Sequence, residues 1–253
     1  MTAAPDPTTT STVRVGLLQC GHVRADVATD HGDYPELFAA LLADAPVELV
    51  TYVAADGQVP DDPRACDGWL ITGSASSVYE PLPWIDEAGR FLARVVEAEV
   101  PLVAVCFGHQ LLAQALGGRV ERSDQGWGVG VHRYDVVAPL PGWPEPTPPK
   151  ELTLLASHQD QVTVLPDGAT VLAASEHCPV AAYSLGPRVV AVQAHPEFTP
   201  ALSRDLIEAR HDVIGPDRAD AALAALDDPD TIARLDHRVV ARWFSHVLTA
   251  PST

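Results

Sequence analysis

The first half of the chain alternates apolar runs with amphipathic segments, and this order constrains the fold more than any other feature of the sequence. The apolar runs are residues 13–20, 47–55, 68–73 and 101–105. Each is almost continuously apolar, which is typical of parallel strands that helices cover on both faces. Amphipathic helices are predicted for residues 34–45, 84–99 and the stretch that leads from Cys106 to Gly118. The alternation predicts an α/β fold with a mostly parallel central sheet flanked by helices.

The second half has a different texture, with short β-like runs separated by turn residues. These runs are residues 129–137, 151–157, 169–175 and 188–195, and they predict a smaller β portion. The proline-rich segment 138–150 suits neither a helix nor a central strand, so we expect an exposed loop or lid there. From Pro200 onward helices are predicted, the last of them over residues 228–248 with Asp230 as its N-cap.

The charge balance excludes several classes of function. The chain has 34 Asp and Glu against 16 Lys and Arg, a formal net charge of −18 that repels nucleic acids and anionic membrane surfaces. Its only lysine, Lys150, lies outside any GxxxxGK[ST] phosphate-binding loop. No apolar run has the length of a membrane span, and the opening residues have no secretion-signal pattern. We therefore expect no nucleic-acid or membrane partner, no cofactor and no consumption of ATP by this chain.

The cysteine spacing favours free thiols. Four cysteines are widely separated and form no CxxC pair: Cys20, Cys66, Cys106 and Cys178. This pattern argues against a disulfide framework and against a metal site, and it fits a reducing cytoplasm. Because no repeat or second domain is visible, we expect one domain over residues 13–250, preceded by a disordered tail of residues 1–12.

Cys106 stands between the end of a buried strand and the start of a helix. A side chain on such a turn is exposed above the sheet, and the helix N-terminus favours a thiolate and can bind an oxyanion. Gly108 and Ala104 are small enough to allow the tight bend. A buried cysteine that merely fills space would fit the same local pattern, so a base is needed to decide between the two interpretations.

The candidate base is His195 in the segment VVAVQAHPEF. Pro196 disfavours helix at His195 and keeps the chain extended, so His195 and Glu197 point to the same side. An imidazole can then take and return protons while the carboxylate fixes its tautomer and stabilises its charged form. Together with Cys106, these two residues predict a Cys-His-Glu catalytic triad.

Three motifs taken together resemble the class I glutamine amidotransferases. VCFGHQLLAQALGG is similar to the nucleophile motif of that family, QAHPEF to its His-Pro-Glu motif, and DGWLITGS to the loop that supplies an oxyanion-hole amide. Further segments, HGDYPELF, PLPWI and SHQDQV, resemble the free-standing, GMP-synthase-like members, a group that includes γ-glutamyl peptide hydrolases. The resemblance implies the flavodoxin-like fold of that family and extends from about Val13 to the last helix.

The resemblance also implies roles for individual residues. It places the nucleophile at Cys106, the base at His195, its orienting carboxylate at Glu197, and the oxyanion donors at the amides of Gly73 and Phe107. Five residues are implied or expected to bind the glutamyl group: Ser74, Gln110, His158, Gln159 and Asp160. The implied reaction cleaves the γ-amide of glutamine or of a γ-glutamyl compound through a thioester on the cysteine. It yields glutamate and either ammonia or an amine.

Several alternatives stay open at this stage. The leaving group is either ammonia, handed to a separate synthetase, or a larger amine released by a free-standing γ-glutamyl peptide hydrolase. A non-catalytic regulatory or binding protein could retain the fold. In the related chaperone and deglycase type of cysteine hydrolase a histidine typically follows the nucleophile, whereas Phe107 does so here. Cys20 with His22 is a weaker pair, because no helix begins directly after Cys20 and no carboxylate stands beside His22.

Overall fold

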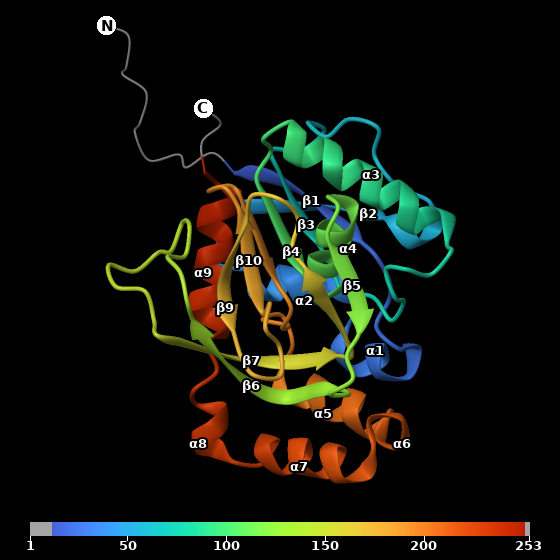
Figure 1. Cartoon of the computed structure of the whole chain (residues 1–253), viewed down its shortest axis with the longest axis vertical. Helices are drawn as coiled ribbons and strands as arrows, with labels where there is room; N and C mark the ends of the chain where they lie inside the picture. Colours follow the sequence, from blue (N-terminus) through green and yellow to red (C-terminus); the bar gives the residue numbers. More distant parts are fainter. Residues whose placement is uncertain (1–11, 251–253) are drawn as a thin grey trace, which may run out of the picture.

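A computed structural model describes residues 12–250, and its centre is a nine-stranded sheet (Figure 1). Five strands form the parallel half, in the order β2-β1-β3-β4-β11. Their bounds are β1 (Val13–Gln19), β2 (Val47–Val53), β3 (Gly68–Ile71), β4 (Leu102–Val105) and β11 (Val189–Val192). The predicted α/β sheet flanked by helices is confirmed. The predicted tail, residues 1–12, lies outside the described residues except for Thr12.

Three of the four runs of the predicted smaller β portion continue the same sheet in antiparallel order, which is β10-β9-β6-β7, whereas the fourth run, residues 188–195, contains β11 of the parallel half. Its strands are β6 (Gly128–Val136), β7 (Glu151–His158), β9 (Ala169–Ala174) and β10 (Ala182–Leu185). β10 was not predicted, because its four-residue run is too short to stand out. β5 (Arg119–Arg122) and β8 (Asp160–Val164) form a separate antiparallel pair. Across the sheet, pairing therefore changes from parallel to antiparallel at β11, which is parallel to β4 and antiparallel to β10.

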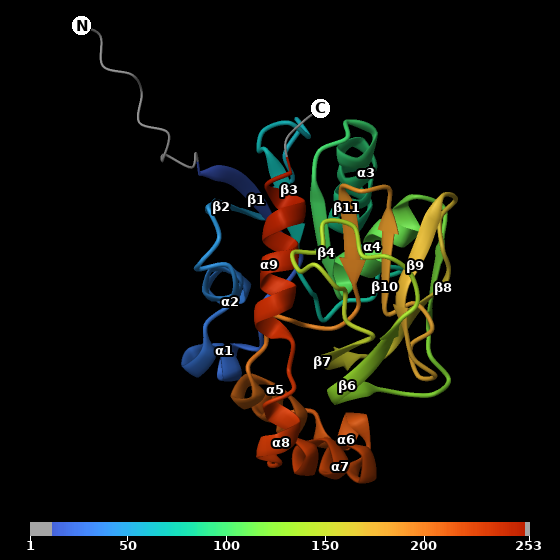
Figure 2. The same ribbon diagram turned by 90° about the vertical axis from the view of Figure 1, so that its left-hand side faces the viewer.

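Helices cover both faces of the parallel half (Figures 1 and 2). α3 (Pro83–Glu97) and α4 (Phe107–Ala115) pack on one face, and α2 (Tyr34–Leu41) and α9 (His237–Leu248) on the other. Successive strand residues alternate between the two cores, as Leu17 and Leu18 do in β1. Within residues 12–250, no helix is both long enough and apolar enough to cross a bilayer.

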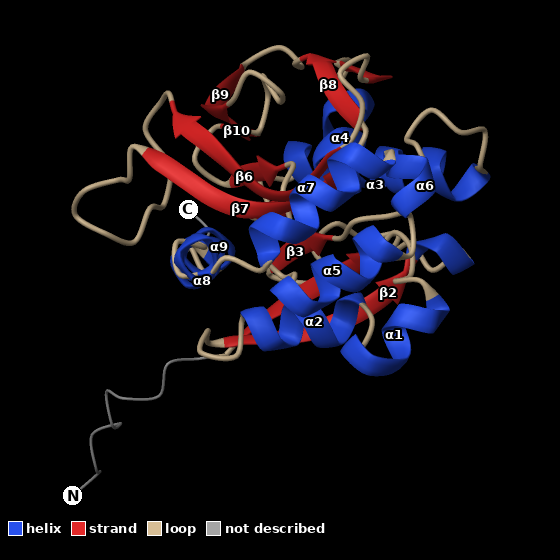
Figure 3. Cartoon of the chain, turned by 90° about the horizontal axis from the view of Figure 1, so that it is seen from below, coloured by secondary structure: helices blue, strands red, loops and turns tan. Residues whose placement is uncertain are grey.

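The C-terminal helices form a layer below the antiparallel strands (Figure 3). They are α5 (Pro200–Glu208), α6 (His211–Ile214), α7 (Pro216–Leu226) and α8 (Pro229–Ile232). α7 packs on β6, and α5 packs on α7. Two further short helices that the sequence pattern did not predict are α1 (Ala25–His31) and the 3-10 helix η1 (Ala54–Asp56).

The prediction of one helix over residues 228–248 was wrong. The chain forms α8, leaves the helical path and begins again as α9. The interruption is caused by a tertiary contact between Asp236 and Thr153 of β7. The Asp236 amide donates to the Thr153 carbonyl at 2.9 Å, and the Thr153 amide donates to the Asp236 carboxylate at 2.8 Å. The cap of α8 is Asp228, whose side chain accepts from the amide of Asp230, and not Asp230 itself.

The proline-rich segment 138–150 contains no helix or strand, as predicted. It lies against α9, where the Trp243 indole donates to the carbonyl of Pro141 at 2.6 Å. The Trp143 and Trp243 rings are 5.6 Å apart between centroids, and Arg242 pairs with Glu145. These contacts tie the segment to the helix.

Candidate active site

Cys106 occupies the turn between β4 and α4 and is the N-cap of that helix. Its backbone has φ +51° and ψ −103°, a strained conformation for a residue with a side chain. The surroundings enforce it, because the Cys106 amide donates to Val192 of β11 at 2.9 Å and the Gly108 amide to Thr72 at 3.1 Å. The predicted strand, turn and helix are confirmed, and the thiol stands at the carboxyl end of the parallel strands.

Gly108 is required by the close approach of α4 to β3. A methyl group on this residue would lie 2.8 Å from the Cβ and Cγ2 of Ile71 and 3.0 Å from its carbonyl oxygen. Such distances are well inside van der Waals contact, so the helix start would have to move away from the strand. The glycine thus allows the first turn of α4, directly after Cys106, to pack closely against β3.

We expect the Gly108→Ala substitution to destabilise the protein by about 1–3 kcal/mol, the usual cost of overpacking a rigid core. The matched control is Gly89→Ala in α3, where the new methyl group would lie 3.5 Å from the Cβ of Ala115, an ordinary contact. Alanine in a helix interior is favoured over glycine, so this control should gain up to about 1 kcal/mol. Urea unfolding of both variants measures the difference. Equal stabilities would contradict the tight contact at Gly108.

His195 and Glu197 form a buried pair. The Nδ1 atom of His195 lies 2.7 Å from Oε1 of Glu197, with side chains 2% and 0% exposed. The strand predicted to end at His195 ends three residues earlier, at Val192. The His195 amide instead donates to Leu155 of β7 at 2.8 Å, which anchors the histidine between the two halves of the sheet. Phe198 stacks on the imidazole with centroids 3.9 Å apart.

The electrostatic surroundings favour the charged form of His195. Burial lowers the pKa of the imidazole. The charges of Cys106 and Glu197 and the hydrogen bonds to both side chains outweigh this effect and raise the pKa to about 10. An imidazolium at neutral pH is the partner that a thiolate requires. The structure therefore brings together Cys106, His195 and Glu197, the three residues on which the sequence argument depended.

The two amides predicted as oxyanion donors lie beside this group. A methyl group on Gly73 would be 2.7 Å from the Tyr34 hydroxyl and 3.0 Å from Cε1 of His195, so this glycine touches both rings. Phe107 is the first residue of α4, where backbone amides have no partner within the helix. Within the described part of the chain, neither amide donates a hydrogen bond. Both are thus available to a bound oxyanion.

Three of the five predicted substrate-binding residues form one network. The Gln110 side-chain amide donates to the Asp160 carbonyl at 2.8 Å and to Oε1 of Gln193 at 3.0 Å. His158 contacts the same carbonyl through Nδ1 at 3.2 Å. The Asp160 carboxylate accepts from Ser77 and Tyr79, which follow the β3 loop. This network joins α4, β8 and the loop after Gly73.

The other two predicted residues lie outside that network. Gln159 contributes its carbonyl to the Ser123 amide at 3.0 Å. Ser74 lines a small hollow together with Tyr34, Phe198 and Arg210. Within residues 12–250, neither side chain forms a hydrogen bond with the network around Gln110. The segment around His158 is therefore divided between the network and a surface turn.

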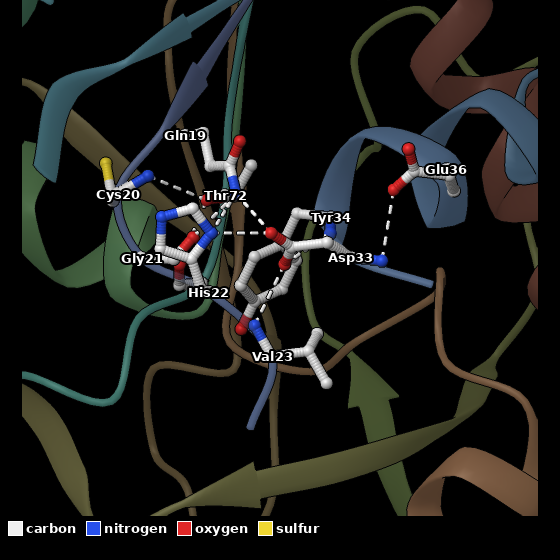
Figure 4. A network of polar contacts seen from close by, with 10 residues as sticks. Gln19, Cys20, Gly21, His22, Val23, Asp33, Tyr34, Glu36 and Thr72 are labelled. Carbon is white, nitrogen blue, oxygen red and sulfur yellow. Dashed lines mark hydrogen bonds and ion pairs between the residues drawn. The ribbon is translucent and has the colours of Figure 1, made fainter. Parts of the chain in front are cut away.

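Sequence reasoning gave no role to Tyr34, which the structure places against Gly73. Its position follows from Asp33, the N-cap of α2 (Figure 4). The Asp33 carboxylate accepts from Gln19, His22 and the amides of Val23 and Tyr34 at 2.6–2.9 Å, and Glu36 closes the capping box. The signal was present in the sequence, since Asp33 and Glu36 have the spacing of a capping box. The box supports the helix start at residue 34 that the apolar periodicity already predicted.

The alternative thiol, Cys20, is positioned differently. Its amide donates to the Thr72 hydroxyl at 3.0 Å, so Cys20, like Cys106, lies at the carboxyl end of the parallel strands. Its sulfur is fully buried in the core on the α3 and α4 face, and burial raises the pKa of this thiol strongly. His22 does have a carboxylate partner, Asp33, which lies too far along the chain for the local pattern to reveal it. Cys20 is therefore held as an unreactive thiol.

The comparisons with known proteins agree with this geometry. The family model of glutamine amidotransferase class-I matches residues 37–211, and the chain belongs to that family. The glutamine-hydrolysing GMP synthase subunit of Halobacterium salinarum is 34% identical over 68% of this chain and 87% of its own. Gamma-glutamyl peptidase 3 of Arabidopsis thaliana is 27% identical over 72% of this chain and 76% of its own.

Solved structures show the same fold. A glutamine amidotransferase from Thermotoga maritima superposes with a TM-score of 0.73 at 18% identity, covering 94% of this chain and 99% of that one. Another, from Methylobacillus flagellatus, has a TM-score of 0.64 at 22% identity and covers 94% and 92% of the two chains. The flavodoxin-like architecture implied by the sequence motifs is thus the architecture of this family.

Proposed function

We propose that this protein is a cysteine hydrolase that cleaves the γ-amide bond of glutamine or of a γ-glutamyl compound, with Cys106, His195 and Glu197 as its catalytic triad. The observation that carries the proposal is the buried His195–Glu197 pair at 2.7 Å, set beside a thiol on a strained helix N-cap. A structural cysteine needs neither the strained turn nor the charged imidazole.

In the proposed reaction the Cys106 thiolate attacks the γ-carbonyl carbon, and the carbonyl oxygen becomes an oxyanion bound by the amides of Gly73 and Phe107. The C–N bond then breaks as the His195 imidazolium gives its proton to the departing nitrogen. The product is a γ-glutamyl thioester. Neutral His195 next deprotonates a water molecule, whose attack breaks the C–S bond, releases glutamate and restores the thiolate–imidazolium pair.

Glu197 has an orienting role in this proposal. Its carboxylate holds Nδ1 of His195 and stabilises the imidazolium, while the stacked ring of Phe198 fixes the imidazole plane. For the glutamyl amino and carboxylate groups we propose Ser74, Gln110, His158, Gln159 and Asp160. The network around Gln110 supports this for three of them, since the Gln110 amide donates to the Cys106 carbonyl at 3.1 Å and its side chain therefore lies one helical turn after the nucleophile.

The identity of the leaving group separates two forms of the proposal. The likeness to the GMP synthase subunit supports release of ammonia to a separate synthetase, and the likeness to gamma-glutamyl peptidases supports release of a larger amine. Both forms share the same acyl-enzyme chemistry. Strong stimulation of glutamine hydrolysis by a co-purifying synthetase would favour the first.

The purified protein should release glutamate from glutamine or from γ-glutamyl compounds without added metal or nucleotide. A panel of these substrates, read by enzymatic glutamate detection, tests this expectation. A diazo-oxo-norleucine electrophile should also label Cys106 selectively over the buried Cys20, as peptide mass spectrometry would reveal. If no compound yields glutamate and both cysteines label at the same slow rate, the chain is a binding protein and the proposal fails.

A further inference from the structure

A small hollow beside the reaction centre contains an arginine that the proposed mechanism does not use. The hollow is lined by His22, Arg24, Tyr34, Ser74, Phe198 and Arg210, among others. Arg210 follows the end of α5, and its side chain is half-buried. Among residues 12–250, its guanidinium has neither a carboxylate nor a carbonyl partner. The five N–H donors of this guanidinium therefore have no partner among the described residues.

The second arginine of the hollow is already occupied. This residue is Arg24, which donates two hydrogen bonds to the Asp26 carboxylate, from Nε at 3.0 Å and from Nη2 at 2.7 Å. Arg204, which lies on the helix that leads to Arg210, is likewise paired with Asp227. In a chain with 34 acidic and 16 basic residues, an unpaired arginine in a cavity is set apart from these two. Its charge is available to an anion from solution.

The hollow adjoins the His195 side of the reaction centre. Phe198, one of its walls, stacks on the His195 ring, and Tyr34, another wall, packs its hydroxyl against Gly73. Burial raises the pKa of Tyr34, the charges of Cys106 and Glu197 raise it further, and the charge of Arg210 opposes them. Tyr34 is thus within electrostatic reach of both the thiol and the arginine. Figure 4 shows the Tyr34 ring directed toward the segment of His22 and Val23, which also lines the hollow.

The hollow lies where the leaving group of a bound substrate is expected. His195 must give its proton to the departing nitrogen, so the group on that nitrogen lies on the side of His195. Of the residues proposed for the glutamyl part, Ser74 lines the hollow, whereas the network of Gln110, His158 and Asp160 lies outside it. Ammonia would leave the hollow empty. A substituent on the nitrogen would enter it.

The size of the hollow limits what that substituent carries. The volume of the hollow that is open to the centre of a water molecule is about 30 Å³. One bound water occupies about 10–15 Å³ of such volume. A group with two oxygen atoms fits, and a large side chain does not. Arginine binds a carboxylate through two parallel charge-assisted hydrogen bonds, which are stronger than hydrogen bonds between neutral groups.

Resting on the proposed function, we propose that Arg210, with the Tyr34 hydroxyl beside it, binds the free α-carboxylate of an amino acid leaving group. The preferred substrate class is then a γ-glutamyl amino acid, and glutamine is a poor substrate. The reaction consumes one water, breaks the γ-amide bond and releases glutamate and the free amino acid. The acyl-enzyme steps are unchanged.

The test compares three substrates that differ only in the leaving group: γ-glutamyl-alanine, γ-glutamyl-alaninamide and glutamine. For the wild-type enzyme we expect kcat/KM to be about 10- to 100-fold higher for the free acid than for its amide, the usual worth of charge-assisted hydrogen bonds. Arg210→Gln should remove this preference by lowering only the value for the acid. Arg210→Lys should retain part of it, since lysine keeps the charge but not the paired geometry.

Arg204→Gln is the matched control, because Arg204 carries the same charge on α5 but is paired with Asp227 outside the hollow. It should leave the acid-to-amide ratio unchanged. An equal loss on all three substrates in Arg210→Gln, or a wild-type ratio near one, would overturn the assignment while hydrolysis itself stands. If the wild type releases glutamate from none of the three, the proposed function fails and the assignment fails with it. The wild-type ratio needs no variant, so poor folding of Arg210→Gln does not block the test.

Discussion

Cys106→Ala is expected to lower kcat/KM for γ-glutamyl hydrolysis by about 10⁴-fold or more and to leave the protein folded. Without the sulfur no thioester forms, and His195 alone cannot bring a water molecule to the substrate with comparable efficiency. The fold should survive because alanine keeps the Cβ, and the amides of Cys106 and Gly108 keep their hydrogen bonds to Val192 and Thr72. Steady-state kinetics and a thermal melt measure the two effects separately.

Cys20→Ala is the matched control for the loss of a buried thiol. Cys20 is fully buried on the other face of the sheet, so its removal should lower stability by about 1–3 kcal/mol and leave kcat/KM within about twofold. The opposite outcome, loss of activity in Cys20→Ala with full activity in Cys106→Ala, would transfer the chemistry to the pair of Cys20 and His22. Activity in both variants would rule out a cysteine nucleophile.

The sequence predicted the parallel half of the sheet well because its strands are buried on both faces. A strand such as β4, with four residues that are all fully buried, reads as a continuous apolar run whatever lies next to it. The turn at Cys106 could be found for a similar reason, since strand, small residues and helix follow one another directly along the chain. These features are local, and local features can be deduced from sequence.

The misses arose where distant residues decide the structure. Asp236 ends the helical path because Thr153 of β7 takes both of its hydrogen bonds, a contact that no periodicity reveals. β11 ends at Val192 for a comparable reason, because Leu155 of β7 captures the His195 amide. In both places the antiparallel half of the sheet overrides the local pattern.

The site was predicted in the same uneven way. Cys106, His195 and Glu197 could be proposed because the motifs around them are continuous in sequence, and the observed pairing of His195 with Glu197 follows from the extended chain before and after Pro196. The roles proposed for Tyr34 and Arg210 could not be deduced from the sequence, because Tyr34 begins α2, Arg210 lies between α5 and α6, and the two residues line one hollow only in the folded protein. A sequence motif cannot reveal a hollow whose lining residues come from α2 and from the segment after α5.

The packing of Phe198 joins the reaction centre to the hollow. Phe198 follows Glu197 in the same motif, yet its ring has two functions in the fold: one face stacks on His195, and the residue also lines the hollow that contains Arg210. A single aromatic residue therefore holds the His195 ring and shapes the hollow next to it. Changes at this position should alter the imidazole orientation and the leaving-group preference together.

His195→Gln is expected to lower kcat/KM by about 10³-fold or more, because the variant lacks both the proton donor for the departing nitrogen and the base for the second step. Glutamine is chosen over alanine because its side-chain amide can still donate to Glu197, whose carboxylate is buried and costly to leave unpaired. Labelling of Cys106 by a neutral electrophile at pH 7 should slow in parallel, since the imidazolium that stabilises the thiolate is gone.

Glu197→Gln is expected to lower activity less than His195→Gln does, and it also changes the pH dependence of the reaction. The negative charge of Glu197 raises the pKa of His195, so its removal should lower that pKa. In the proposed reaction the imidazolium is the form that protonates the leaving group, and this form is lost as the pH rises through the pKa of His195. The alkaline limb of the kcat profile should therefore move to lower pH in Glu197→Gln, with a loss of activity smaller than in His195→Gln. An alkaline limb that stays in place, or moves upward, would mean that Glu197 does not act on this imidazole and that its 2.7 Å contact serves packing alone.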